Sequence, residues 1–517
     1  MSVPQNEIAP EDGAVIKLLR YLGNNEKYQL TMYLLDQYRG TSVSCRYRIP
    51  PRLENLDAQT ELVSEVQGAI ARMVLKHPVL QVGIVDADSK TPRWVQLDSI
   101  RLSHHIEWKF LDSPVDFEES SRLVTISQLD ATYTDLDRCP GWKIVVLHQR
   151  ETNLLEVLFT WNHPHADGMS GKIFHQDLLR CLNNTGGDEI ELQLHEDALK
   201  LPQSPLRLPP PIEQATKLPI TLGFAMKTLW QEFRPPILCR GTAQATWAPI
   251  HTSPYKTQLR VFTVENDILV KILSACRQHK TTLTGLMHGL MLVSLASRLE
   301  AKVAPAFQSI TALNLRPYVP SSPPGYPWLE PERTMGNYVT IMPHEFDEAL
   351  VTNIRLELPP KTTAGECLTA NLMNQIWSAA ADVRRGIERK QELGVKNDNV
   401  GLMKFVGDWQ QQMSDTARRP RQNSWFITNL GVLDGKPKLD EATSSGGQDG
   451  TWSVRRAQFS TSAETTSAAL IISPMTVAGE HLCVVGTWQD CIFDVRLGEQ
   501  VMADLEKWLI EIGSQAS

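Results

Sequence analysis

The sequence predicts an α/β fold divided into two halves, and three observations support this prediction. Helical and strand patterns alternate along the 517 residues. A proline-rich stretch at 201–219 lies near the middle of the chain and argues against a regular helix or a central strand there. The length allows about two to four domains. We therefore expect a first subdomain at 1–200, a linker at 201–244 and a second subdomain at 245–517.

The first half contains the patterns of one long helix and several strands. Apolar residues at helical spacing predict a helix over 58–77, which Pro78 ends. The residues that follow, 79–88, read as a strand leading into a turn. Two β-rich runs at 141–150 and 154–161 are separated by three residues, which indicates a hairpin or neighbouring strands.

The second half repeats this mixture. A strongly apolar run at 282–301 predicts a buried helix, and an amphipathic run at 502–513 predicts a helix near the end of the chain. The runs 422–432 and 481–495 read as core strands. Two further stretches have the composition of loops because they are rich in proline or in glycine and polar residues; these are 317–333 and 434–450.

Composition and charge exclude several classes of protein. Hydrophobic residues make up 42% and charged residues 21%, as in ordinary globular proteins. The net charge is −8 and the basic residues are dispersed, so the chain shows no electrostatic footprint for nucleic acid. Eight cysteines without a C-x-x-C pair argue against a zinc cluster, and we expect no metal site. No signal peptide and no apolar run of ~18 residues is visible, so we expect a cytoplasmic protein without a transmembrane segment.

One segment, NHPHADG, carries chemistry. His163 stands at the end of a core strand, and Pro164 keeps it extended because the residue before a proline avoids helical dihedrals. Asp167 and Gly168 suit the turn into the next helix, which Asp167 can cap with its side chain. The pattern H-x-x-x-D-G is a modest signal alone, and the strand–loop–helix setting strengthens it. His165 is assigned no catalytic role.

Several segments occur in the order found in a known family. The chain resembles the fungal alcohol acetyltransferases and condensation domains within the chloramphenicol-acetyltransferase-like, CoA-dependent acyltransferase superfamily. Many relatives carry two adjacent histidines, whereas Asn162 occupies the first position here, and His163 matches the histidine that acts. The D-F-G-W-G motif of the plant enzymes is absent. The matching segments are LKHPVLQVGI, NHPHADGMSG, TLTGLMHGLMLVSLA, ALNLRPYVP, MGNYVT and FITNLGVLDG.

The resemblance implies two chloramphenicol-acetyltransferase-like subdomains, with mixed sheets flanked by helices and a tunnel at their interface. It implies that His163 is the general base, since a histidine with an ordinary pKa of ~6.5 is largely neutral at cellular pH. A structural, hydrogen-bonded histidine is the alternative. Gly168 would allow close approach to a ligand or a neighbouring strand, and Thr428 and Asn429 would face the oxyanion. Asp167 would support the loop by pairing with an arginine, for which the candidates are Arg316, Arg46 and Arg48.

The function expected from this resemblance is transfer of an acyl group, acetyl in the first instance, from a CoA thioester to a hydroxyl of a hydrophobic small molecule in fungal secondary metabolism. Acyl-CoA is then a co-substrate, no cofactor is permanently bound, and the chain is expected to be a monomer. One alternative is a stand-alone condensation-like enzyme that uses a carrier-protein thioester to form an ester or amide. Another is a non-catalytic or cyclase scaffold. Five arginines are candidates for binding the phosphates of CoA: Arg384, Arg385, Arg418, Arg419 and Arg421. The alternative is that they are ordinary solvated surface charges.

Overall fold

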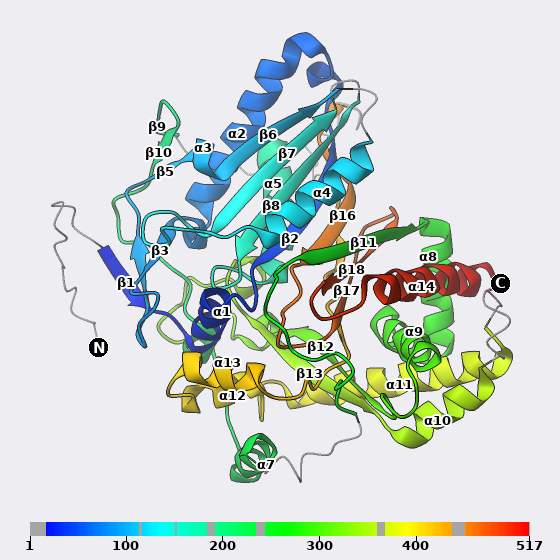
Figure 1. Ribbon diagram of the computed structural model, residues 1–517. Coiled ribbons are helices and arrows are strands. Elements are labelled where there is room, and N and C mark those ends of the chain that lie inside the picture. The colour runs from blue at the N-terminus through cyan, green and yellow to red at the C-terminus, as the bar shows by residue number, and fades with distance from the viewer. Residues whose placement is uncertain are drawn as a thin grey trace.

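The computed structural model describes residues 17–112, 116–149, 152–183, 192–233, 243–358, 368–436 and 450–515. Two mixed sheets, each covered by helices, lie side by side, and the helical segment α7 stands away from the body (Figure 1). This arrangement is the α/β fold with two subdomains that the sequence predicted. Within the described residues, no helix is long and apolar enough to cross a membrane.

The first subdomain is built on a five-stranded sheet with the order β16-β2-β8-β7-β6. Its strands are antiparallel except for the pair β6 and β7, which is parallel. Helices α2 and α5 pack against each other, and α5 also contacts β2. The elements are β2 (Gly40–Arg48), α2 (Gln59–Lys76), β6 (Ile106–Leu111), α4 (Phe117–Asp130), β7 (Trp142–Gln149), β8 (Leu154–Asn162) and α5 (Gly168–Leu182).

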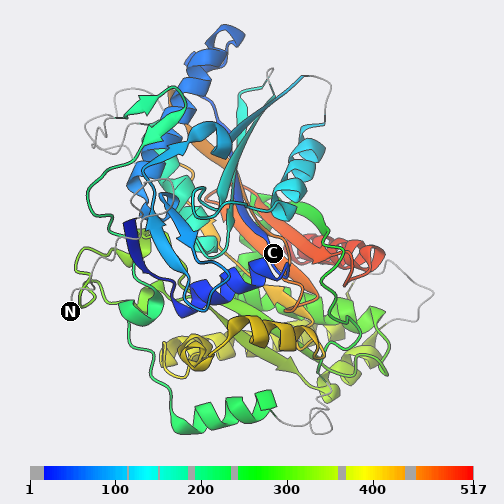
Figure 2. The same cartoon turned by 60° about the vertical axis from the view of Figure 1, so that its left-hand side comes forward.

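Smaller elements surround this sheet. One three-stranded sheet has the order β1-β4-β3 and another β5-β10-β9. Helix α1 lies between the two subdomains in both views (Figures 1 and 2). These elements are β1 (Lys17–Tyr21), α1 (Asn24–Leu34), β3 (Val82–Val85), β4 (Arg93–Gln96), β5 (Ser99–Arg101), α3 (Leu102–His105), β9 (Leu194–His195), β10 (Ala198–Lys200), α6 (Ile212–Ala215) and α7 (Leu222–Phe233).

The second subdomain is built on a seven-stranded sheet with the order β11-β18-β17-β14-β12-β13, in which β15 also pairs with β17. The helices α8, α9 and α14 pack together, and α9 and α11 pack side by side. The elements are β11 (Thr257–Val264), α8 (Asn266–Gln278), α9 (Leu283–Arg298), β12 (Phe307–Asn314), β13 (Val339–Phe346), α10 (Glu348–Glu357), α11 (Ala370–Leu393), α12 (Asn399–Leu402), α13 (Trp409–Ala417), β14 (Trp425–Ile427), β15 (Gly431–Leu433), β17 (Leu470–Val477), β18 (Leu482–Gln489) and α14 (Val495–Gln515). Strand β16 (Ser453–Thr461) lies between β15 and β17 in the sequence but belongs to the sheet of the first subdomain.

One strand departs from the expected division of the chain at 201–244. Strand β16 lies in the second half of the sequence, yet it pairs with β2 over Arg48 to Thr41 and forms the edge of the first sheet. It also contacts β17 and β18, so it joins the two subdomains. The second subdomain therefore does not contain all of 245–517. No local pattern reports this exchange, because a β-strand looks the same whichever sheet it joins.

Most predicted elements have counterparts. The helix expected at 58–77 is α2, the helix at 282–301 is α9, and the two β-rich runs form the antiparallel pair β7 and β8. The apolar residues of these elements form two separate buried cores, one in each subdomain. The stretch 434–450 lies largely outside the described residues.

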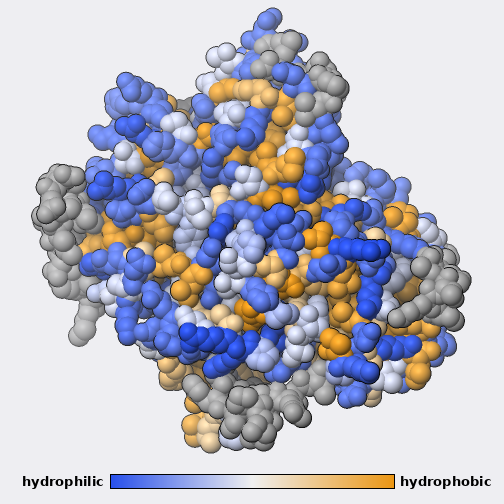
Figure 3. Space-filling view, in the orientation of Figure 1, coloured by the Kyte–Doolittle hydropathy of each residue, from blue (hydrophilic) through white to orange (hydrophobic). Residues whose placement is uncertain are grey.

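The predicted linker contains regular structure. Helix α6 begins directly after Pro211, where a proline is compatible with a helix N-terminus. Helix α7 follows within 201–244, and its apolar side chains Leu222, Met226 and Trp230 are exposed. Hydrophobic atoms show at the lower edge of the surface in Figure 3, where α7 lies in Figure 1.

Candidate active site

The loop between β8 and α5 is held in place by hydrogen bonds to its main-chain groups. Asn162 ends the strand and donates its main-chain N–H to the carbonyl oxygen of Gly141 at 2.7 Å. The Trp161 indole donates to the carbonyl oxygen of Ala166 at 2.7 Å, which closes the loop around Pro164. A histidine carried by such a loop has little freedom to move, as a positioned catalytic group requires.

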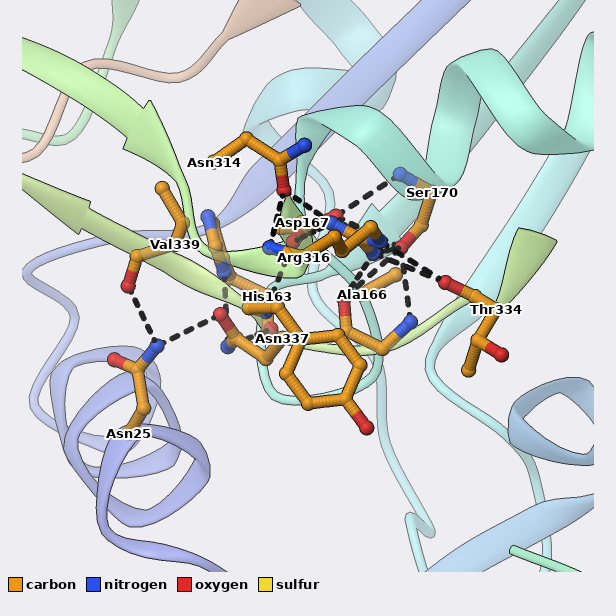
Figure 4. A network of polar contacts seen from close by, with 12 residues as sticks. Asn25, His163, Ala166, Asp167, Ser170, Asn314, Arg316, Thr334, Asn337 and Val339 are labelled. Atoms are coloured by element: carbon orange, nitrogen blue, oxygen red, sulfur yellow. Dashed lines mark hydrogen bonds and ion pairs between the residues drawn. The ribbon is translucent and has the colours of Figure 1, made fainter. Parts of the chain in front are cut away.

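Asp167 connects the start of α5 to the second subdomain by hydrogen bonds. Its carboxylate accepts hydrogen bonds from the main-chain N–H and the hydroxyl of Ser170, both at 2.9 Å, and so caps the helix. It also accepts the main-chain N–H of Tyr338, at 2.9 Å, from the segment that precedes β13. Figure 4 shows these groups gathered around the carboxylate. Asp167 therefore ties the start of α5 to the segment before β13.

The arginine that pairs with Asp167 is Arg316. Its guanidinium makes a bidentate pair with the carboxylate, at 2.7 and 3.0 Å, and the two side chains are 0% and 3% exposed. It also donates to the carbonyl oxygens of Thr334 and Gly336. Arg46, another of the three candidates, instead pairs with Glu118 and Glu156. Burial alone raises the pKa of Asp167, but Arg316 and the other donors bring it below its ordinary value.

His163 is positioned from the opposite side by an asparagine. The amide nitrogen of Asn337 donates to the His163 carbonyl oxygen at 3.0 Å and lies 3.4 Å from Nδ1 of its ring. Asn25, on α1, donates to the Asn337 side-chain oxygen at 2.9 Å, so α1 supports the same group (Figure 4). The ring of Tyr38 packs against the imidazole with 5.4 Å between centroids.

The protonation state of His163 follows from its surroundings. Burial disfavours the imidazolium and lowers the pKa to about 4, although the nearby carboxylate of Asp167 and a main-chain hydrogen bond act in the other direction. The ring is therefore neutral at pH 7. A neutral imidazole is the form that can accept a proton.

His163 lines a cavity of about 170 Å³ between the two subdomains. The walls include residues of α1, the β8–α5 loop, β12, β13, α12, β14, β16 and β17. Apolar side chains predominate, and no lysine or arginine is found among the described residues of the walls. The first subdomain supplies Asn25, Tyr28, Gln29, Tyr38, His163 and Gly168.

Of the two residues expected at the oxyanion, the structure brings only one to the cavity. Thr428 lines it. Its main-chain N–H donates to the carbonyl oxygen of Ile472, and no partner of its hydroxyl is found among the described residues. Asn429 does not line the cavity. Its side-chain nitrogen donates to Thr284 and its side-chain oxygen accepts the N–H of Gly431. The side chain of Asn429 is thus bonded within the fold, and its role at the oxyanion stays a prediction.

Gly168 is needed for packing against the neighbouring strand. A Cβ atom at this position would lie 2.9 Å from atoms of both Leu430 and Phe459, the latter on β16. Real Cβ contacts are not this short, so a side chain here would displace the side chains of Leu430 and Phe459.

Three other histidines lie outside the walls of this site. His165 is buried, accepts a hydrogen bond from the N–H of Gly141 and packs its ring against Trp94. His288 is buried on α9 and bonds to the hydroxyls of Thr311 and Ser309. His104 lies on the single helical turn α3.

The arginine candidates for CoA phosphates do not gather at the cavity. Arg421 is buried and donates to the carbonyl oxygens of Ala248, Thr465 and Ser467, so its charge is used within the fold. Arg384 and Arg385 pair with acidic neighbours on α11.

The sequence analysis did not identify three residues of this site: Asn25, Tyr38 and Asn337. Asn337 lies within MGNYVT, a segment that resembles the family, so its position was marked although its role was not. The other two precede any recognisable motif.

The chain is similar in sequence to known acetyltransferases. The family model described as alcohol acetyltransferase matches residues 96–326, which include the His163 loop. A probable alcohol acetyltransferase, FCK4 of Fusarium pseudograminearum, is 26% identical over 460 residues, which cover 87% of each chain. The chain is an acyltransferase related to the alcohol acetyltransferases.

Solved structures show that the fold of this acyltransferase is shared. The trichothecene 15-O-acetyltransferase TRI3 of Fusarium sporotrichioides superposes with a TM-score of 0.68 at 13% identity, covering 98% of this chain and 97% of that one. The condensation domain of the polyketide synthase MokA gives a TM-score of 0.55 at 11% identity, covering 97% and 98%. At these identities the likeness concerns the two-subdomain fold alone.

Proposed function

We propose that the protein transfers an acetyl group from acetyl-CoA to a hydroxyl of a hydrophobic small molecule, with His163 as the general base. The observation that carries the proposal is that a neutral imidazole lines an apolar cavity between the subdomains. The ring makes a hydrogen bond to the main chain of His163 itself, which only Nδ1–H can reach, so we assign the proton transfer to Nε2. An apolar cavity without cationic walls suits an uncharged, hydrophobic acceptor better than an anionic one.

The reaction then proceeds in two stages. Nε2 of His163 takes the proton of the acceptor hydroxyl as its oxygen attacks the thioester carbonyl, which forms a tetrahedral oxyanion. The Thr428 hydroxyl donates a hydrogen bond to this oxyanion. When the intermediate collapses, the carbon–sulfur bond breaks and the imidazolium returns its proton to the thiolate. The products are the acetate ester and free CoA.

Asp167 and Arg316 act only by holding the loop. Their bidentate pair ties the start of α5 to the segment before β13 and keeps His163 at the interface of the subdomains. A supporting role explains why the carboxylate of Asp167, four residues after His163, does not line the cavity.

The test is release of CoA thiol by the purified protein supplied with acetyl-CoA and a panel of hydrophobic alcohols. His163→Ala should lower kcat/KM by roughly 10²–10⁴-fold, the usual contribution of a positioned base. His104→Ala, on the exposed turn α3, is the matched control and should leave the rate unchanged. A rate that survives His163→Ala would exclude base catalysis by this residue.

The donor is tested in a parallel reaction. The same alcohols are offered with an acetyl-loaded carrier protein in place of acetyl-CoA. Turnover with the carrier alone would replace the CoA proposal by the condensation-like alternative. The proposal for secondary metabolism rests on the likeness to the fungal acetyltransferases.

A further inference from the structure

A second ionisable side chain faces the cavity that contains His163. Glu464 lies on the segment between β16 and β17 and lines the same cavity. Oε1 accepts hydrogen bonds from the Tyr28 hydroxyl at 3.1 Å and from the Thr466 hydroxyl at 3.3 Å. For Oε2, no hydrogen-bond partner is found among the described residues. Oε1 of Glu464 is therefore bonded to the protein, whereas Oε2 can bond to a ligand.

The surroundings make this available oxygen unusual. Burial raises the pKa of Glu464 to about 7, because the charged form loses its water. The cavity walls include the apolar side chains of Ile310, Ile341, Phe426 and Phe459 besides polar ones. A buried carboxyl group is stable only when its polar atoms find partners. A ligand that enters the cavity and excludes water must therefore supply a partner for Oε2.

The segment that carries Glu464 is rigid and strained. Ala463, directly before it, has a φ of +58°, a conformation that alanine rarely adopts. Strained residues persist only where the surrounding structure holds them, and they cluster at functional sites.

Neighbouring hydrogen bonds provide this hold. The N–H of Thr465 donates to the carbonyl oxygen of Gln37 at 2.8 Å, and the N–H of Ser462 donates to that of Gly40 at 2.9 Å. The buried guanidinium of Arg421 donates to the carbonyl oxygen of Thr465 at 2.8 Å. Arg421 thus fixes the main chain of the segment, and its donors are not directed at the Glu464 carboxylate.

We propose that Glu464 and Tyr28 form a subsite that binds a hydrogen-bond-donating group of the acceptor, a hydroxyl or an ammonium, at a position remote from the hydroxyl that is acetylated. The inference rests on the proposed function, since His163 defines the reacting end of the acceptor. It deepens that function because it selects acceptors with two polar groups joined by an apolar frame. Simple alkanols would leave Oε2 unpaired and bind poorly.

The test compares three series of acceptors of equal chain length: 1-alkanols, α,ω-diols and ω-amino alcohols of four to ten carbons, each with acetyl-CoA. For at least one length, the wild-type protein should favour the diol or the amino alcohol over the alkanol by roughly tenfold or more in kcat/KM, mainly through KM. A hydrogen bond to a charged or polar buried group accounts for a factor of this size.

Variants then assign the preference to this side chain. Glu464→Leu should abolish the preference for both bifunctional series. The isosteric Glu464→Gln should retain the preference for the diol, since an amide oxygen still accepts a hydrogen bond, and lose that for the amino alcohol. Tyr28→Phe should weaken both, and Glu332→Gln, at an exposed glutamate, should change neither.

The outcomes separate the two proposals. If neither the diols nor the amino alcohols are acetylated faster than the alkanols, or if Glu464→Leu keeps the wild-type ratio, the subsite is wrong although acetyl transfer stands. If the wild-type protein releases no thiol with any acceptor, the proposed function itself fails. A preference for the amino alcohols alone that Glu464→Gln removes would identify the bound group as an ammonium.

Discussion

Replacement of Arg316 by methionine tests how the His163 loop is held. The guanidinium makes a bidentate pair with Asp167, both side chains are buried, and it donates further to the carbonyl oxygens of Thr334 and Gly336. Methionine fills a similar volume without a charge. In Arg316→Met, Asp167 keeps only the donors from Ser170 and Tyr338.

The expected loss is large because one partner of a buried ion pair is left alone. Such a change costs about 3–5 kcal/mol in the free energy of unfolding. For a chain of this length, that corresponds to a midpoint of thermal unfolding lowered by roughly 3–5 °C. Acetyl transfer should fall as well, since the loop that carries His163 is no longer tied to the second subdomain.

The stability lost in Arg316→Met should depend on pH, because it comes from the charge of Asp167. In the wild type, the pKa of Asp167 lies below its value in the unfolded chain, ~3.9, so its contribution to stability is fully present above that value and is lost as the pH falls through the folded pKa. Without Arg316, burial raises this pKa. Arg316→Met should therefore be most destabilised near pH 7, and the difference from wild type should narrow as the solution is acidified.

The assay is urea unfolding of the wild type, Arg316→Met, Asp167→Asn and the double variant, at pH 5 and pH 7. The double variant should be less destabilised than the sum of the two single ones, because it leaves no unpaired charge. Arg385→Met, at an exposed ion pair on α11, is the matched control and should change stability by less than about 1 kcal/mol. A loss below about 1 kcal/mol for Arg316→Met, or full additivity, would refute the reasoning.

Three further predictions concern the same site. Because burial lowers the pKa of His163 to about 4, kcat/KM for an alkanol should be level near neutrality and decline only around that pH; an acid limb centred at 6.5 or above would contradict this. Asn337→Ala should lower kcat about tenfold with little change in KM, measured by thiol release, since it removes the donor to the His163 carbonyl oxygen; an unchanged kcat would remove Asn337 from the positioning of the base. Gly168→Ala should destabilise the fold by about 1–3 kcal/mol in thermal unfolding, whereas Gly223→Ala on exposed α7, where a Cβ meets nothing within 4 Å, should not; equal effects would refute the packing argument.

Local patterns predicted the parts of the site that are local. His163, Asp167 and Gly168 lie within six residues, and the strand, proline and helix start around them specify the geometry of the loop. The pattern also indicated that Asp167 caps a helix, which the hydrogen bond from Ser170 confirms.

The remaining parts depend on contacts between distant segments. Arg316 was one of three arginines that could not be separated, because the choice depends on how the subdomains pack. The role of Asn337 depends on its contact with the distant His163, and Glu464, which lies in no recognised motif, lines the cavity only in the folded chain. The sequence did not predict that β16 joins the first sheet for the same reason, since its pairing with β2 depends on the whole fold.

The pairing of β16 with β2 also governs how the chain can reach its native state. The edge of β2 is completed only by residues made roughly 400 positions later, so the first half waits with an unpaired strand edge while the rest is synthesised. Contacts of such long sequence separation slow folding and leave that edge open to aggregation. Fragments cut within 201–244 would therefore be insoluble when expressed alone, and productive refolding would require both pieces in one mixture.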